Sequence, residues 1–174
     1  MESKHLAVHH RLHSSRQHAH VMTGNARLTY YIFEGLLVGI INGAMIHVSA
    51  WTGGGAGSTK NTPNETANNP YYYGLEEVDN KPKHVHVHGG PIPPGRYTIH
   101  PPAHNKTVGL SAQLDPLQKL PNDRAGFLIH KVGPHGSDGC IVLADKDFHA
   151  LMNSLKASQG GALVVCQAAD SVFV

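Results

Sequence analysis

The order of apolar and polar residues along the chain predicts mostly short strands. In Ala44–Trp51, His47 and Ser49 fall on one face and Ile46 and Val48 on the other, which is the two-residue period of a half-buried strand. Further strands are predicted at Arg27–Tyr31, Arg96–His100, Phe127–Lys131 and Ala162–Gln167. We therefore expect a mainly β chain.

A single helix is predicted over about residues 145–158. Its apolar side chains recur at three- and four-residue spacing, which places them on one face: Phe148, Leu151, Met152 and Leu155. Asp145 is a suitable N-cap, and Gly160 and Gly161 end the helix. The expected fold is a compact, sandwich-like β domain with this one helix packed against it.

The segments between these elements are rich in turn-forming residues. Residues 52–70 form a long polar loop, and residues 101–125 are expected to be mostly loop. The prolines and Gly95 of residues 90–97 predict a rigid bend before the next strand. We expect loop 52–70 and the bend at 91–95 to form walls of a substrate groove, the alternative being ordinary surface loops. Three residues between Arg27–Tyr31 and Ala44–Trp51 predict a turn: Gly39, Asn42 and Gly43.

The charge balance excludes some classes of partner. The 174 residues include 14 basic and 12 acidic side chains, for a formal charge of +2. That imbalance is too small to indicate nucleic-acid binding or strong attraction to an anionic membrane. The apolar stretch Phe33–Ile41 is too short to span a bilayer, and no secretory signal is visible. We expect no nucleic-acid partner and no membrane span.

The 15 histidines are unevenly distributed, with a cluster near the N-terminus. Residues 1–22 show no apolar periodicity, so they cannot bury enough area to offset the entropy lost on ordering. We expect a flexible His-rich tail or leader over residues 1–22 and a single catalytic domain over residues 23–174.

Two cysteines, Cys140 and Cys166, are too few for a disulfide framework. Cys166 lies in a predicted strand, where a small buried hydrophobic residue is expected. Cys140 instead follows Gly139 at the end of a Gly-rich turn. This position makes Cys140 the candidate for a working thiol.

The surroundings of Cys140 have the residue types that a thiol nucleophile needs. Such a thiol requires a nearby base and hydrogen-bond donors that face the oxyanion formed on attack. His130, ten residues earlier at the end of a strand, can fold back across the turn as the base. The N–H groups of Gly139 and Cys140 would form the oxyanion hole. The alternative is a core histidine and a merely buried cysteine, but a loop so rich in glycine favours a site.

The Ser-x-Gly-Cys-Ile run at residues 137–141, with His130 upstream, resembles the signature of the L,D-transpeptidases. The Gly-Pro-Ile-Pro-x-Gly-x-Tyr segment at residues 90–97 makes the chain most similar to their compact branch, typified by the type VI secretion effector Tlde1. The resemblance covers roughly residues 28–165. It implies a compact L,D-transpeptidase-like fold.

The resemblance also implies a function: L,D-carboxypeptidase or transpeptidase exchange on peptidoglycan stem tetrapeptides through a thioester on Cys140. By the same resemblance, His130 is the base, Ser137 orients the turn or assists the oxyanion site, and no metal or cofactor is required. An antibacterial effector of this kind is secreted without a classical signal peptide and acts in the periplasm of a target bacterium. An immunity protein would be its partner.

The sequence departs from the broader family at one position. A second His commonly precedes the Gly-Cys pair, and Asp138 stands there in this chain. A carboxylate beside the nucleophile would raise the pKa of the thiol unless it points away or orients a base. We expect Asp138, together with His135 and Gly136 of the same turn, to contact substrate, and His135 to take an accessory role.

Two other readings use the same residues. A metal-dependent hydrolase would take its ligands from the histidines of the chain, the candidates being His84, His86, His88, His130 and His135. No carboxylate at a fitting spacing accompanies them, so a groove-lining role is the better interpretation of His84–His88. A non-enzymatic cell-wall-binding domain of the same fold is the second alternative, and it would not need the thiol.

Overall fold

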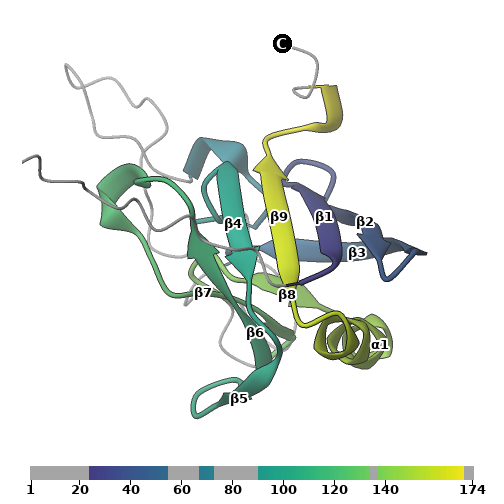
Figure 1. Cartoon of the computed structure of the whole chain (residues 1–174). Coiled ribbons are helices and arrows are strands. Elements are labelled where there is room, and N and C mark those ends of the chain that lie inside the picture. Colours follow the sequence, from purple (N-terminus) through teal and green to yellow (C-terminus); the bar gives the residue numbers. More distant parts are fainter. Residues whose placement is uncertain (1–23, 55–66, 73–89, 134–136, 171–174) are drawn as a thin grey trace, which may run out of the picture.

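The computed structural model describes residues 24–54, 67–72, 90–133 and 137–170. These residues form a mainly β fold with a single α-helix, as predicted (Figure 1). The strands are β1 (Ala26–Tyr31), β2 (Leu36–Ile41), β3 (Ala44–Thr52), β4 (Gly95–Ile99), β5 (Ala103–Asn105), β6 (Gly109–Pro116), β7 (Phe127–Lys131), β8 (Ile141–Leu143) and β9 (Gly161–Cys166). The helices are α1 (Asp145–Ala157) and two short 3-10 turns, η1 (Pro70–Tyr72) and η2 (Pro121–Asp123).

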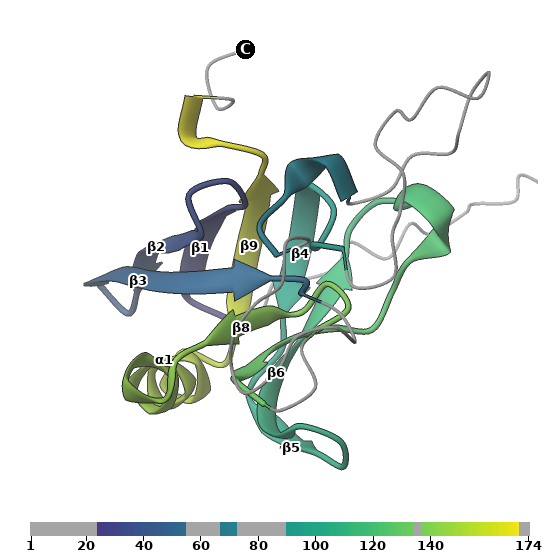
Figure 2. The same ribbon diagram turned by 180° about the vertical axis from the view of Figure 1, so that it is seen from behind.

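All nine described strands belong to one curled sheet. Their order is β4-β9-β1-β2-β3-β8-β7-β6-β5, and an additional pairing between β4 and β6 closes the sheet on itself. Most neighbours are antiparallel, whereas β1–β9 and β7–β8 are parallel. Seen from behind, β3 runs across β1 and β9 toward β8 (Figure 2). The two parts of the sheet therefore face each other across a shared core.

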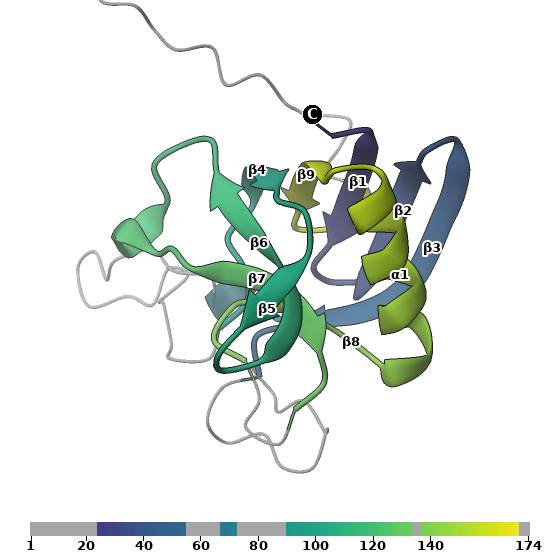
Figure 3. The same ribbon diagram turned by 60° about the horizontal axis from the view of Figure 1, so that its bottom comes forward.

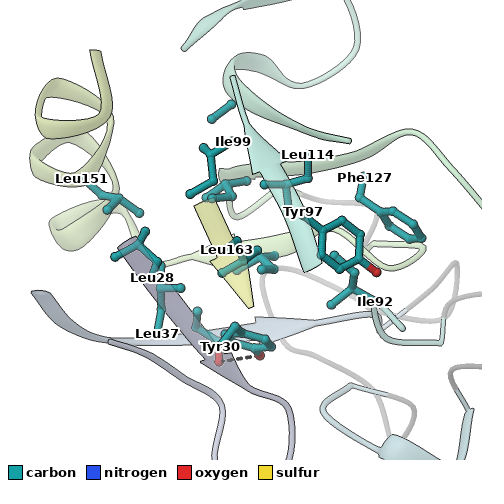
Figure 4. Close-up of a cluster of buried hydrophobic side chains, with 14 of the residues drawn as sticks. Leu28, Tyr30, Leu37, Ile92, Tyr97, Ile99, Leu114, Phe127, Leu151 and Leu163 are labelled. Atoms are coloured by element: carbon teal, nitrogen blue, oxygen red, sulfur yellow. Dashed lines mark hydrogen bonds between the residues drawn. The ribbon is translucent and has the colours of Figure 1, made fainter. Parts of the chain in front are cut away.

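The core is filled by the inward-facing side chains of the strands and by one face of α1. Tyr97 and Phe127 meet edge to face with ring centroids 6.1 Å apart, and both are buried beside Ile92 (Figure 4). The helix α1 lies at one end of the curled sheet, directly after β8 (Figure 3). Its four predicted apolar positions are all buried, which confirms the predicted face: Phe148, Leu151, Met152 and Leu155.

Several local predictions are wrong. The N-cap of α1 is Ala144, and Asp145 is the first helical residue. Asp145 therefore interacts with the helix dipole without capping the helix through its side chain. Gly39, expected in a turn, lies inside β2. Only glycine fits there, because a Cβ would collide with the Arg27 carbonyl oxygen of β1. Residues 101–125 contain β5, β6 and η2.

Two residues have surroundings different from those expected. Thr52, assigned to the long loop, is the last residue of β3 and is fully buried. Cys166 lies in β9 as predicted, but it is partly exposed and not a core residue. The predicted tail at residues 1–22 and most of loop 52–70 lie outside the described residues.

Candidate active site

The pairing of β7 with β8 places Cys140 and His130 on the same face of the sheet. These strands are parallel, with Ile129 opposite Ile141 and His130 opposite Val142. Continuing this register by one residue puts Cys140 opposite Leu128, two positions from His130 along β7. Because side chains alternate between faces, Cys140 and His130 lie opposite the face that carries Ile129 and Ile141 into the core. Among the described residues, no hydrogen bond joins the thiol to the imidazole.

The environment of His130 favours a neutral imidazole. The residue is 5% exposed, and its Nδ1 lies 2.7 Å from the backbone carbonyl oxygen of Lys131. A carbonyl only accepts hydrogen bonds, so Nδ1 carries the proton and Nε2 keeps its lone pair. Burial lowers the pKa of His130, partly offset by this backbone hydrogen bond. At neutral pH the ring is therefore a base with one available nitrogen.

The turn that carries the nucleophile is closed by Ser137. The backbone N–H of Cys140 donates to Ser137 Oγ at 2.8 Å, and Ser137 Oγ donates to the Cys140 carbonyl oxygen at 3.2 Å. Ser137 is buried. The hydroxyl therefore holds both ends of the Cys140 backbone, which fits the turn-orienting role expected for it.

Thr52 joins this turn to the proline-rich bend. Its hydroxyl donates to the Gly139 carbonyl oxygen at 3.0 Å and accepts the backbone N–H of Ile92 at 2.9 Å. Both Thr52 and Ile92 are fully buried. One side chain at the end of β3 thus links two segments that are far apart in the sequence.

Gly139 is required by its surroundings. Its φ is +91°, and a Cβ there would lie 2.5 Å from Nη2 of Arg124 and 2.6 Å from Cε1 of Phe127. Of the two amides expected in the oxyanion hole, that of Cys140 already donates to Ser137. The N–H of Gly139 has no hydrogen-bond acceptor in the described part of the chain, so it is the available donor.

Arg124 is a site residue that the sequence did not reveal. Its guanidinium donates to the carbonyl oxygens of Pro91 at 2.6 Å and Gly90 at 3.1 Å. It lies 3.6 Å from a carboxylate oxygen of Asp138 and 5.2 Å above the Phe127 ring. Arg124 directly follows η2, in a stretch that the sequence predicts as loop. Only its position shortly before a buried strand could have drawn attention to it.

The electrostatics of Cys140 combine opposing effects. Burial raises the pKa of the thiol above its ordinary value, and the Asp138 carboxylate raises it further. A backbone hydrogen bond with Leu128, the Ser137 hydroxyl and the Arg124 guanidinium lower the pKa. The balance favours a neutral thiol in the resting protein, so a base must remove its proton when it reacts.

A cavity of about 190 Å³ opens on the same face of the sheet. It is lined by residues of β5, β6, β7 and the segment after β4: His100, Pro101, Ala103, His104, Asn105, Ser111, Gln113 and Leu128. Ser111 pairs with His130 and Gln113 with Leu128 across β6 and β7. The cavity therefore begins beside the residues that flank the thiol and the imidazole.

Some predicted site residues lie outside the described residues. His135 and Gly136 belong to this group, as do His84, His86 and His88. Within the described ranges, no group of three or more His, Cys, Asp or Glu side chains is arranged to hold a metal ion. No described helix has the length and apolar character needed to cross a membrane.

Comparison with known families decides the relationship. The model of the Tlde1 domain matches residues 67–166, more than half of the chain. The chain belongs to the Tlde1 domain family. The L,D-transpeptidase-like resemblance drawn from the Gly-Cys motif is thereby confirmed. No curated protein sequence matches this Tlde1-domain chain.

Solved structures similar to this chain include several L,D-transpeptidases. One from Xylanimonas cellulosilytica DSM 15894 is 14% identical with a TM-score of 0.43. The match covers 83% of this chain and 61% of the Xylanimonas chain. One from Mycobacterium tuberculosis H37Rv is 14% identical with a TM-score of 0.46, and the match covers 82% of this chain and 58% of that structure. Bd1075 of Bdellovibrio bacteriovorus is 9% identical with a TM-score of 0.45, and the match covers 84% of this chain and 49% of Bd1075. This chain spans about half to three-fifths of each of them.

Proposed function

We propose that this chain is a peptidoglycan-modifying enzyme in which Cys140 is the nucleophile and His130 the general base. Membership of the Tlde1 domain family supports the enzyme class. The observation that carries the residue assignment is the β7–β8 register, which puts the thiol and a neutral imidazole on one face. The substrate we propose is the tetrapeptide stem of peptidoglycan.

The proposed reaction begins with proton transfer. His130 Nε2 takes the proton of Cys140 Sγ, and the sulfur attacks the carbonyl carbon of the third stem residue. The resulting oxyanion faces the N–H of Gly139. Collapse breaks the C–N bond, and the imidazolium returns its proton to the amine of the departing D-alanine. A thioester on Cys140 remains.

The second half of the reaction consumes the thioester. Water that loses a proton to His130 attacks the thioester carbonyl and releases a tripeptide stem, which is L,D-carboxypeptidase activity. An amine that attacks in place of water forms a new amide, which is transpeptidase exchange. In both cases the proton on His130 returns to the sulfur. The lining of the cavity beside Leu128 offers hydrogen-bonding side chains to part of the peptide.

The decisive experiment incubates purified disaccharide tetrapeptide with the protein and follows loss of D-alanine by mass spectrometry. Cys140→Ala should abolish the release, by at least about a thousandfold for a nucleophile of this kind. Cys166→Ala is the matched control, since Cys166 is the other free cysteine and lies in β9. It should retain full activity.

The same assay separates the alternatives. Activity that is lost with EDTA and survives Cys140→Ala would indicate the metal-dependent hydrolase. Wild-type protein that binds the muropeptides and leaves them unaltered would indicate a wall-binding domain.

The cellular role that we propose is that of a secreted antibacterial effector acting in the target periplasm, neutralised by an immunity protein. Directing the chain to the periplasm of a test bacterium should arrest growth, whereas cytoplasmic expression should not. Cys140→Ala should be harmless in both compartments. Toxicity of the cytoplasmic form would contradict this role.

A further inference from the structure

Arg124 is a buried cation held by several segments of the fold. Its side chain is 7% exposed. Burying a guanidinium costs several kcal/mol unless polar groups compensate for the lost water. Here the compensation comes from two backbone carbonyls of the proline-rich bend, at Gly90 and Pro91, and from the face of Phe127.

The guanidinium also contacts the turn that carries the nucleophile. Nη2 lies 3.6 Å from Oδ1 of Asp138 and only 2.5 Å from the position that a Cβ of Gly139 would take. Arg124 is therefore packed against the backbone immediately before Cys140. The same nitrogen bonds Gly90, so one group bridges the bend and the nucleophile turn.

This position has an electrostatic consequence for the thiol. The charged and titratable groups near Cys140 are Arg124, Asp138 and, on the same face of β7, His130, while Tyr97 of β4 interacts with Arg124. Asp138 disfavours a thiolate, and Arg124 favours one. The Asp138 side chain is 44% exposed, so its field is more strongly screened by solvent than that of the buried guanidinium.

We propose that Arg124 is a positioning residue of the active site, which fastens the nucleophile turn to Gly90 and Pro91 and offsets the charge of Asp138 so that the Cys140 thiolate can form. The proposal rests on the nucleophilic role proposed for Cys140. It assigns a role to a residue outside the Ser-x-Gly-Cys run and explains how a carboxylate is accommodated next to a nucleophile.

The test measures the thiol itself and needs no substrate. The rate of alkylation by iodoacetamide is recorded against pH in a Cys166→Ala background, so that only Cys140 reports. Arg124→Gln should shift the midpoint of this profile upward by about one pH unit, an approximately tenfold loss of thiolate at neutral pH. Asp138→Asn should shift it downward, and the double variant should lie between the two single variants.

Arg124→Lys separates the electrostatic role from a purely structural one. Lysine keeps the positive charge but loses the planar, two-carbonyl geometry. Its profile should stay close to that of the unsubstituted Arg124 protein even where its thermal midpoint falls. Equal profiles for Arg124→Lys and Arg124→Gln, or a Gln profile that does not move, would overturn the proposal. If Arg124→Gln does not fold, a Lys profile shifted upward by a full unit would overturn it.

Failure of the proposed function gives a different result. If the protein never releases D-alanine but shows these shifts in alkylation, the result supports the effect of Arg124 on the thiol and contradicts the proposed peptidoglycan substrate. If the protein releases D-alanine but the alkylation profiles of the variants do not shift, the result supports the proposed function and contradicts the role proposed for Arg124.

Discussion

Replacing Gly139 with alanine tests whether the nucleophile turn is packed as described. The new methyl group would meet Nη2 of Arg124 at 2.5 Å and Cε1 of Phe127 at 2.6 Å. Arg124 cannot move away freely, because its guanidinium bonds two carbonyls. Phe127 is 1% exposed and packed against Tyr97. The methyl group added by Gly139→Ala therefore has no open space to enter.

Two terms make up the expected cost. A positive φ of +91° is unfavourable for alanine by about 1–2 kcal/mol. Alanine also lowers the conformational entropy of the unfolded chain, which offsets about 0.4–1 kcal/mol of this cost. Displacing the guanidinium weakens at least one charge-assisted hydrogen bond, at about 1.5–3 kcal/mol. Together these terms predict a loss of about 2–4 kcal/mol in the free energy of unfolding.

Gly126→Ala is the matched control. Gly126 has a similar φ of +79°, but a Cβ there would meet nothing within 4 Å. It should lose only the backbone term, about 1 kcal/mol or less. Urea unfolding followed by the fluorescence of Trp51, the single tryptophan, measures both variants. Equal midpoints for Gly139→Ala and Gly126→Ala would refute the described contact between the turn, Arg124 and Phe127.

Two further predictions concern pH and the link to the bend. Because burial lowers the pKa of His130, the base stays unprotonated to lower pH, and the acid limb of kcat/KM should have its midpoint below about 6.5, the ordinary value for histidine. A midpoint above that value would argue against His130 as the base. Thr52→Val keeps the shape but leaves the Ile92 N–H and the Gly139 carbonyl unsatisfied, which should cost about 1–3 kcal/mol in urea unfolding. Thr52→Ser retains the hydroxyl and should cost less, so equal stability of the two variants would contradict the bridging role.

The strands that could be predicted are those with a strong local pattern. Phe127–Lys131 coincides with β7, and Ala44–Trp51 is β3 less its final residue. The strand β6 was missed although Leu110, Ala112 and Leu114 alternate with polar residues there. Residues 101–125 were expected to be mostly loop, but the polar residues of β6 alternate with Ala112 and Leu114 and lie on the opposite face of the sheet from them. The alternation of apolar and polar residues was therefore present in the sequence. Whether it marks a strand depended on which face of the sheet packs against the core.

Strand β2 was missed for a different reason. Gly39 was interpreted as a turn residue, since glycine commonly marks turns. In the structure it lies opposite Leu28 in the β1–β2 pair, where the backbone of β1 occupies the space of a side chain. Such a requirement arises from a neighbouring strand and has no signal in the local sequence.

The candidate site divides in the same way. Cys140, His130, Ser137 and Gly139 lie within one short stretch, so the sequence could bring them together as a motif. Thr52 and Arg124 come from elsewhere in the chain and act through contacts that only the fold creates. The sequence predicted Gly139 as a donor of the oxyanion hole, but it gave no sign of the Arg124 and Phe127 side chains that fill the space beside it.

The connection between β7 and β8 explains why these distant residues matter. Parallel neighbours usually need a crossover of a dozen or more residues, but β7 ends at Lys131 and β8 begins at Ile141. A connection this short returns the chain to the start of β7 and delivers Cys140 beside Leu128. The three-residue strand β8 offers few ladder hydrogen bonds to hold that position. Contacts of Thr52 and Arg124 with this turn add to the constraint. Thr52→Val and Arg124→Gln should therefore change the reactivity of the thiol, although neither residue is proposed to contact substrate.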